Sequence, residues 1–354
     1  MTDKKQKILI VRLSSLGDIL HNIPLANQLK SAGYEVDWIV SEKGFDLIKD
    51  NPCVDNAILA PVLKWKKNGF SLISFCEYLK ILFGLRQKHY DIAIDTQGIF
   101  KTMYWLKFCG AKRRIVVKNA KEFATWGGNE LIEPIFHGWK RPNVINYLDF
   151  AKHLGINSDE IKYTLPETSK DTKEKVDDFL KNIDKTKPLV VIAPATTWRL
   201  KHWSKDNWKE VVNYLEGRVN LVFTGGPKDK ELLSYIGADR FINLAGKTDL
   251  RDLQEIFSRA ILVMAPDSGS AHLARATNNP AVISIFTCTP PTLFGPFGDD
   301  NKYFSVNGNL DCQPCFTRHC PLEGDKHEQC LTHPSPEEII NIVNKVLQNY
   351  KNSV

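Results

Sequence analysis

The most constraining feature of this sequence is an alternation of short apolar runs with amphipathic segments, which occurs in two series. Apolar runs rich in Val and Ile predict strands buried on both faces, and the segments between them predict helices that cover a parallel sheet. In the first series, strands are expected at 8–13, 36–40, 57–60, 92–95 and 115–117, and helices at 19–31, 44–49, 70–89 and 100–108. In the second series, strands are expected at 189–193, 221–224, 241–243, 261–264 and 282–286, and helices at 205–215, 228–235, 250–258, 270–277 and 336–351.

The two series predict an α/β protein with two doubly wound, Rossmann-like domains, because 354 residues exceed what one core usually holds. We expect a first domain at 1–167, a Lys- and Asp-rich segment at 168–187 that forms a solvated helix and linker, and a second domain at 188–333. The segment 334–354 is expected to form a helix that packs back on the first domain. Ligands of doubly wound sheets bind beyond the carboxyl ends of the strands, so a site is expected there, in a cleft between the domains.

Charge and hydropathy restrict the partners. The net charge of +6 favours an anionic partner, such as a phosphorylated sugar or a phospholipid head group. Nucleic acid is not expected, because no nucleic-acid-binding motif accompanies the charge. The N-terminus MTDKKQ leads directly into a strand without the apolar region of a signal peptide, which predicts a cytoplasmic protein. The apolar segment 70–85 is too short to span a bilayer. We expect an amphipathic helix packed on the core there, with contact to the membrane surface as the alternative.

The first strand runs into the turn Ser14-Ser15-Leu16-Gly17-Asp18. Gly17 permits a tight connection from strand to helix, and Asp18 is expected at the mouth of the cleft. A carboxylate at this place can serve as a base, or it can merely favour the N-terminus of the helix through the helix dipole. The turn lacks the G-x-G-x-x-G pattern, so no nicotinamide or flavin is expected.

Two loops of the second series carry residues suited to a diphosphate. Thr196, Thr197 and Lys201 follow the first strand of the series and offer two hydroxyls and a point charge to phosphate oxygens. A solvated loop is the alternative. Gly225 and Gly226 follow the next strand, where they allow a close approach of the backbone to a ligand or simply form a turn.

The strongest single motif is PDSGSAH, which joins a buried strand to a helix. Ser268, Gly269 and Ser270 would present free backbone N–H groups at the helix N-terminus, which is an anion-binding arrangement. Asp267 and His272 flank it. The alternatives are an N-cap role for Asp267 and a core position for His272.

Four of the eight cysteines lie close together in the sequence, at Cys312, Cys315, Cys320 and Cys330. In a reducing compartment such a cluster favours a metal over disulfides. Four thiolates can hold one metal ion tetrahedrally, although only the first spacing, C-x₂-C, is standard. The cluster therefore predicts a structural zinc or iron site.

Five phrases of the sequence resemble, in order and spacing, the ADP-heptose heptosyltransferases of glycosyltransferase family nine: VRLSSLGDILHNIP, DWIV, IDTQGIFKT, ATTWRLKHW and PDSGSAHLARA. The likeness spans nearly the whole chain and is nearest to the heptosyltransferase I branch. It implies a GT-B fold, inversion at the anomeric carbon, ADP-L-glycero-D-manno-heptose as donor and no metal or other cofactor for catalysis. It also implies an acceptor in the Kdo region of lipid A-Kdo, at the cytoplasmic face of the inner membrane.

The resemblance also assigns roles by position. Asp18 would be the general base, with Ser15 and Gly17 at the acceptor. The donor would be bound by Thr196, Thr197, Lys201, Gly225, Gly226, Asp267, Ser268, Gly269 and His272. The family often has threonine in place of Ser268 and Leu-Ser in place of Ser270-Ala271, which bears on the donor's identity but not on the anion site.

Basic side chains of the first domain suit a phosphorylated and carboxylated acceptor. The candidates are Lys64, Lys67, Arg113 and Lys121, and solvated surface charges are the alternative.

Two other functions fit the sequence: a family transferase that acts on a heptosylated core or a protein, and a non-catalytic sugar-nucleotide-binding protein. Asp18 discriminates between enzyme and binder, because a pure binder has no need of a carboxylate directed at the cleft.

Overall fold

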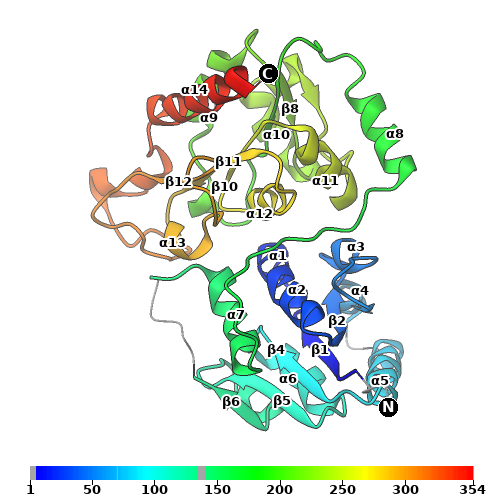
Figure 1. Ribbon diagram of the computed structural model, residues 1–354. Helices are drawn as coiled ribbons and strands as arrows, with labels where there is room; N and C mark the ends of the chain where they lie inside the picture. Colours follow the sequence, from blue (N-terminus) through cyan, green and yellow to red (C-terminus); the bar gives the residue numbers. More distant parts are fainter. Residues whose placement is uncertain (1–4, 70, 134–139, 354) are drawn as a thin grey trace. The chain divides into compact units, whose positions relative to one another are not determined.

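The computed structural model describes residues 5–69, 71–133 and 140–353, and the chain divides into two compact units, 1–167 and 168–354. Each unit is built on a six-stranded parallel sheet with helices packed against it (Figure 1). This architecture confirms the prediction of two doubly wound α/β domains.

The sheet of the first unit has the order β3-β2-β1-β4-β5-β6. Its strands are β1 (Lys7–Val11), β2 (Glu35–Ser41), β3 (Asn56–Ala60), β4 (Ile92–Asp95), β5 (Arg113–Val117) and β6 (Glu130–Ile132). β1 pairs with β2 on one side and with β4 on the other, so the strand order reverses at β1. The carboxyl ends of β1 and β4 therefore form the topological switch point, where doubly wound sheets bind their ligands.

The helices of the first unit form two groups that cover opposite faces of the sheet. On one face, α1 (Leu16–His21), α2 (Ile23–Ser31) and α7 (Asn143–His153) pack together. On the other, α5 (Leu72–Gln87) packs on α6 (Phe100–Phe108), and α6 packs on the short 3-10 helix η1 (Ala124–Gly127). Two short helices, α3 (Phe45–Ile48) and α4 (Val62–Asn68), follow β2 and β3.

The first unit differs from expectation in its helices. The segment expected as one helix at 19–31 forms α1 and α2, which meet at Asn22, with Pro24 in the first turn of α2. Helices α4 and α7 and strand β6 were not expected.

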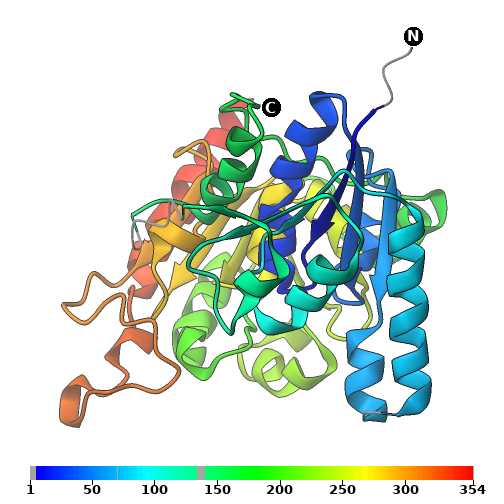
Figure 2. The ribbon, with the colours of Figure 1, turned by 90° about the horizontal axis from the view of Figure 1, so that it is seen from below.

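The expectation that the 70–85 helix packs on the core is wrong for most of its apolar side chains. Phe70 lies outside the described residues. Helix α5 buries only Ser74, Leu82 and Leu85. It leaves exposed Leu72, Ile73, Phe75, Leu79 and Phe83. Helices α4 and α5 lie side by side at one edge of the unit (light blue in Figure 2), joined by an edge-to-face contact between Trp65 and Tyr78.

The sheet of the second unit has the order β12-β11-β10-β7-β8-β9. Its strands are β7 (Leu189–Ile192), β8 (Asn220–Phe223), β9 (Ile242–Asn243), β10 (Leu262–Pro266), β11 (Ala281–Phe286) and β12 (Tyr303–Asn307). Its helices are α8 (Lys170–Phe179), α9 (Lys205–Leu215), α10 (Lys230–Tyr235), α11 (Leu250–Arg259), α12 (Gly269–Ala276), α13 (Pro291–Phe294) and α14 (Pro336–Ser353). The order reverses at β7, which lies between β8 and β10, so the second switch point is at the carboxyl ends of β7 and β10.

Both segments that flank the predicted second domain pack within the second unit. In the segment 168–187, expected as a linker, helix α8 packs on α11, where Val176 is buried and Lys175 forms an ion pair with Asp252. Helix α14 packs on α9 and contributes Ile339 and Val343 to the core. The apolar face of α14, expected to meet the first domain, is thus used within the second unit.

Among the described residues, no helix has the length and apolar character that crossing a membrane requires.

Candidate functional site

Asp18 is the centre of a polar cluster at the switch point of the first unit. Its Oδ2 accepts hydrogen bonds from the backbone N–H (3.2 Å) and the hydroxyl (2.7 Å) of Ser15, which fixes the first turn of α1. The same oxygen pairs with Arg12 Nη2 at 2.7 Å, and Tyr147 Oη donates to Oδ1 at 3.1 Å. The Asp18 side chain remains 24% exposed, whereas that of Arg12 is only 6% exposed. A substrate group can therefore reach the carboxylate but not its main cation.

The ionisation of Asp18 is set by these neighbours. Burial disfavours the charged form, but the Arg12 ion pair and the hydrogen bonds from Ser15 outweigh it, so the pKa of Asp18 lies well below its ordinary value. The carboxylate is therefore ionised at neutral and mildly acidic pH. In this ionised form it can accept a hydrogen bond from a hydroxyl group, as a general base must before it takes the proton.

Sequence reasoning missed Arg12 and Tyr147. The sequence did offer a sign of the role of Arg12, because a charged residue directly after a buried strand needs a buried partner. The sequence offered no such sign for Tyr147, because this residue reaches Asp18 from α7, far along the chain.

Asp267 is the centre of the corresponding cluster in the second unit, at the carboxyl end of β10. Its Oδ2 pairs with Lys201 Nζ at 2.7 Å and accepts from Thr289 Oγ1 at 2.8 Å. His272 Nε2 lies 3.8 Å from Oδ1, and Thr196 Oγ1 donates to the Asp267 carbonyl at 2.9 Å. Four predicted donor-site residues are therefore brought together from the segments that follow β7 and β10 and from α12, and Thr289 is the member that the sequence did not reveal.

The N-terminus of α12 adds donors to this cluster. Ser268 is the N-cap residue, and its buried Oγ has no hydrogen-bond partner among the residues that the structure describes. A buried hydroxyl in a folded protein is normally satisfied, so this atom is available to a ligand. Gly269 and Ser270 follow in the first turn, where backbone N–H groups have no partner within the helix.

The Asp267 pKa leads to a prediction about acid stability. Burial opposes ionisation, but His272 and Lys201 lower the pKa of Asp267 from 3.8 to about 2. Because the folded pKa is depressed, the stabilisation is complete above the unfolded value and is lost as the pH falls through about 2. We expect Asp267→Asn to lower the free energy of unfolding at pH 6 by about 2 kcal/mol.

Urea denaturation at a series of pH values checks this expectation. The difference between wild type and Asp267→Asn should shrink as the pH falls below about 4. The exposed Asp300 supplies the control, since Asp300→Asn should change stability little at any pH. A difference between wild type and Asp267→Asn that stays constant with pH would contradict the assignment.

The remaining predicted donor residues have other surroundings. Thr197 is exposed at the same loop. Gly225 and Gly226 follow β8, and the N–H of Gly226 is bonded to Asp229 Oδ2 at 2.7 Å. A Cβ at Gly225 would meet the same carboxylate at 3.2 Å. Both glycines therefore accommodate Asp229, which favours the turn interpretation for this pair.

The predicted acceptor residues divide into two sets. Ser15 and Gly17 belong to the Asp18 turn, and Lys121 donates its N–H to the Gly98 carbonyl beyond the carboxyl end of β4. Lys64 and Lys67 lie on α4, where Lys64 pairs with Glu77.

Arg113, the remaining predicted acceptor residue, does not lie at the switch-point edge of the first sheet. It begins β5, in register with Ile92 at the start of β4, and it is bonded through two nitrogens to Glu130. In a parallel sheet the start of a strand lies at the edge opposite to the switch point. The expectation of acceptor binding by Arg113 therefore finds no support in the fold.

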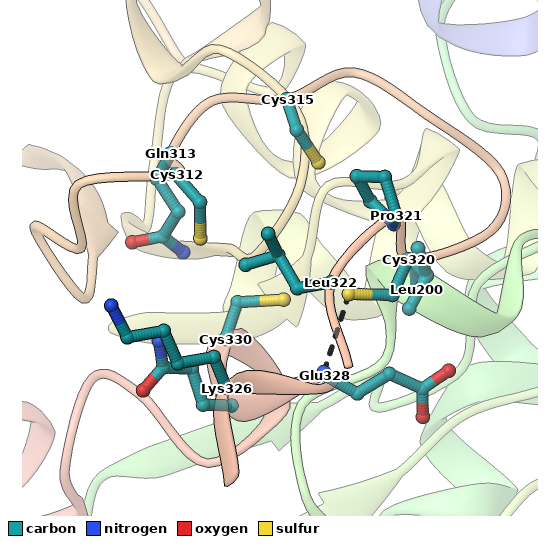
Figure 3. Close-up of a pocket in the computed structure, with 11 residues that line it drawn as sticks. Leu200, Cys312, Gln313, Cys315, Cys320, Pro321, Leu322, Lys326, Glu328 and Cys330 are labelled. Atoms are coloured by element: carbon teal, nitrogen blue, oxygen red, sulfur yellow. Dashed lines mark hydrogen bonds between the residues drawn. The ribbon is translucent and has the colours of Figure 1, made fainter. Parts of the chain in front are cut away.

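The four clustered cysteines line one pocket of the second unit, together with Leu200 and Glu328 (Figure 3). All four are free thiols, and Cys330 is buried. Cys320 Sγ accepts the backbone N–H of Glu328 at 3.3 Å. The fold thus gathers residues that are up to 18 positions apart around one small space.

This arrangement does not reproduce a closed metal site. Among the residues that the structure describes, no three His, Cys, Asp or Glu side chains are placed to hold a metal ion. The structural zinc or iron site stays a prediction, for which elemental analysis should find about one metal ion per chain. Metal-free protein of full stability with all four thiols titratable would contradict it.

Each doubly wound unit thus carries a charged cluster at its switch point, and the pair of units has the two-domain architecture of the GT-B fold. The family model for glycosyltransferase family 9 (heptosyltransferase) matches residues 79–325, which is more than half of the chain. The chain belongs to this family and is a glycosyltransferase.

Individual relatives agree with this placement. Lipopolysaccharide heptosyltransferase 1 of Pseudomonas aeruginosa is 25% identical, with 94% of this chain and 96% of that protein covered. The glycosyl transferase family 9 structure from Veillonella parvula gives a TM-score of 0.81 at 18% identity, covering 99% of each chain. Escherichia coli heptosyltransferase WaaC with ADP gives 0.74 at 22% identity, covering 96% of this chain and 100% of that one. The two structures show that the fold is shared.

Proposed function

We propose that this glycosyltransferase moves L-glycero-D-manno-heptose from ADP-heptose to the Kdo region of the lipopolysaccharide inner core. The observation that carries the proposal is the ionised, partly exposed Asp18 carboxylate at the switch point of the first unit. The relatives support the choice of sugar and acceptor, since heptosyltransferase 1 matches over nearly the whole chain. WaaC, solved with ADP, supports an adenosine diphosphate donor.

Asp18 would act on the acceptor. An acceptor hydroxyl attacks the anomeric carbon, the bond from that carbon to ADP breaks, and the hydroxyl proton passes to Asp18. A strongly acidic carboxyl group is a weak base towards a free alcohol. The hydroxyl becomes acidic only as its oxygen bonds to the positively charged anomeric centre, so the proton transfers late in the reaction. Attack from the side opposite to ADP inverts the anomeric configuration.

The Asp267 cluster would hold the donor. Lys201 uses one N–H on Asp267 and retains two for phosphate oxygens, and its side chain is 16% exposed. Ser268 Oγ and the first N–H groups of α12 add neutral donors. Together they would stabilise the charge that develops on the departing ADP, which is the usual source of a large catalytic contribution. For this reason we propose that catalysis needs no metal.

Ser15, Gly17, Lys64, Lys67 and Lys121 would contact the acceptor. Because the proposed acceptor is lipid-linked, we also propose that the protein is cytoplasmic and works at the cytoplasmic face of the inner membrane.

The experiment that tests the function is a transfer assay with defined acceptors. Purified protein is incubated with ADP-heptose and either Kdo₂-lipid A or its heptosylated product, and the lipid is analysed by mass spectrometry. We expect a mass gain of one heptose on Kdo₂-lipid A. Transfer only to the heptosylated product, or to neither lipid, would contradict the proposal.

A further inference from the structure

The first unit exposes apolar side chains on neighbouring elements of one face of its sheet. On α5, exposed residues at helical spacing form a stripe: Leu72, Phe75, Leu79 and Phe83. Leu72 and Phe83 are 77% and 62% exposed. On α6 a second stripe consists of Phe100, Tyr104 and Phe108, whose rings contact one another in sequence. We call these two stripes the apolar face.

Helices α5 and α6 pack against the core of the first unit through the sides opposite to these stripes. Helix α6 buries Trp105 and Leu106 in the same core cluster in which α5 buries Leu82 and Leu85, and α6 also buries Met103. The apolar face therefore points away from the sheet, and folding of the unit does not require it. Exposed patches of this kind usually mark an interaction site.

The 3-10 helix η1 extends the apolar face. It packs on α6 and holds Phe123 and Trp126 as a ring pair 5.7 Å apart. These two side chains are 71% and 70% exposed. An exposed tryptophan beside an exposed phenylalanine suits the boundary between lipid head groups and acyl chains.

The segment that carries the apolar face has a surplus of positive charge, although part of it is paired with acids outside the segment, as Arg113 is with Glu130 and Lys88 with Asp37. Residues 62–127 contain 13 Lys and Arg against 4 Asp and Glu, an excess larger than the +6 of the whole chain. Lys66, Lys80 and Lys107 are exposed on α4, α5 and α6. Between β3 and α5, an open groove of about 620 Å³ has Ile58, Ile81 and three lysines among its lining residues. An apolar surface with a cationic rim matches an anionic lipid layer.

We propose that the apolar face, with its lysine rim, docks the first unit on a bilayer that contains anionic phospholipids. A second copy of this chain would meet it with an equally positive rim, so charge favours lipid over self-association. Lys101 Nζ donates to Ser14 Oγ at 2.9 Å, which connects the first turn of α6 to the Asp18 turn. Docking along α5 and α6 would thus bring the Asp18 edge of the unit near the lipid surface. This proposal specifies the surface that would make the membrane contact of the proposed function. It rests on the proposed function only for the biological purpose of that contact.

Vesicle flotation with the full chain and no substrate tests the proposal. Wild type should float with phosphatidylethanolamine–phosphatidylglycerol vesicles and much less with phosphatidylcholine. The triple variant Leu72→Ser, Phe75→Ser, Phe83→Ser should bind the anionic vesicles at least about tenfold more weakly. The charge variant Lys80→Glu, Lys107→Glu should lose about tenfold or more, and added salt should weaken wild type similarly.

Matched controls lie on α14 of the second unit. Tyr350→Ser and Lys345→Glu change exposed helical residues of the same kinds and should leave vesicle binding unchanged. Circular dichroism and thermal melts confirm folding of each variant. Wild-type binding that ignores lipid charge and survives the triple substitution would overturn the proposal. A dimer that the triple substitution dissociates, without any vesicle binding, would assign the apolar face to a second copy instead.

A second readout separates this proposal from the transfer reaction. With an acceptor stripped of its acyl chains, the triple variant should keep wild-type turnover, and with acceptor in vesicles it should lose most of it. Vesicle binding without any heptose transfer would leave the docking surface standing and remove the proposed function. Equal loss of turnover on both acceptors would place α5 in the reaction itself and overturn the docking role.

Discussion

Replacing Asp18 by asparagine should lower turnover by about a hundredfold to ten-thousandfold, the usual contribution of a positioned general base. Affinity for ADP should stay close to wild type, because Asp18 belongs to the first unit and the proposed diphosphate ligands belong to the second. Steady-state kinetics with Kdo₂-lipid A and calorimetry with ADP give the two quantities. Near-normal turnover of Asp18→Asn would remove Asp18 from the mechanism.

The control must account for Arg12, which is buried and loses its carboxylate partner in the Asp18 variant. Asp149 offers the same chemistry in the same unit, since it forms a two-point pair with Arg141 at 2.7 and 3.0 Å and is 5% exposed. Asp149→Asn should therefore cost stability without a comparable loss of turnover. If both variants lose turnover in proportion to stability, Asp18 is a positioning residue.

Replacing Lys201 by alanine should weaken ADP binding by about tenfold to a hundredfold, since a hydrogen bond from a charged donor contributes roughly 1.5–3 kcal/mol. Turnover should fall as well, because the same charge would stabilise the departing diphosphate. The variant should also be less stable, because Asp267 keeps Thr289 and His272 but loses its cation.

A double variant separates the two effects of Lys201. In Lys201→Ala, Asp267→Asn no buried carboxylate is left without its cation, so part of the stability should return while ADP affinity stays low. The exposed Lys205, at the start of α9, gives the matched control, and Lys205→Ala should bind ADP as wild type does. Calorimetry that shows unchanged ADP affinity for Lys201→Ala would refute its role at the diphosphate.

The parallel sheets were predictable because their buried strands are continuous apolar runs. Helices α6 and α9 have the expected bounds, and those of α14 differ by two residues at one end. Several elements escaped prediction, among them the helix α7 of 11 residues. Strand β6 has three residues and α13 has four, too few for a periodic pattern to be recognised.

The site was predictable only as far as its residues lie in motifs that could be recognised in the sequence. Asp18 and Asp267 follow β1 and β10, so the motifs located them. Their partners Tyr147 and Thr289 come from elsewhere in the chain, and only the folded packing supplies them. Arg113 was misplaced because its neighbours in sequence suggested a basic patch, whereas the strand register decides which edge of the sheet a residue reaches.

The packing of α8 on α11 sets where this chain can be recombined with its relatives. A crossover at residue 187 would combine a foreign α8 with the native α11 and disturb the burial of Val176 and the pair of Lys175 with Asp252. A crossover between residues 167 and 168 keeps α8 with the partner it evolved beside. Because the second unit is the proposed donor-binding unit, chimaeras that test for a change of sugar-nucleotide preference should be joined before Ser169, the N-cap of α8.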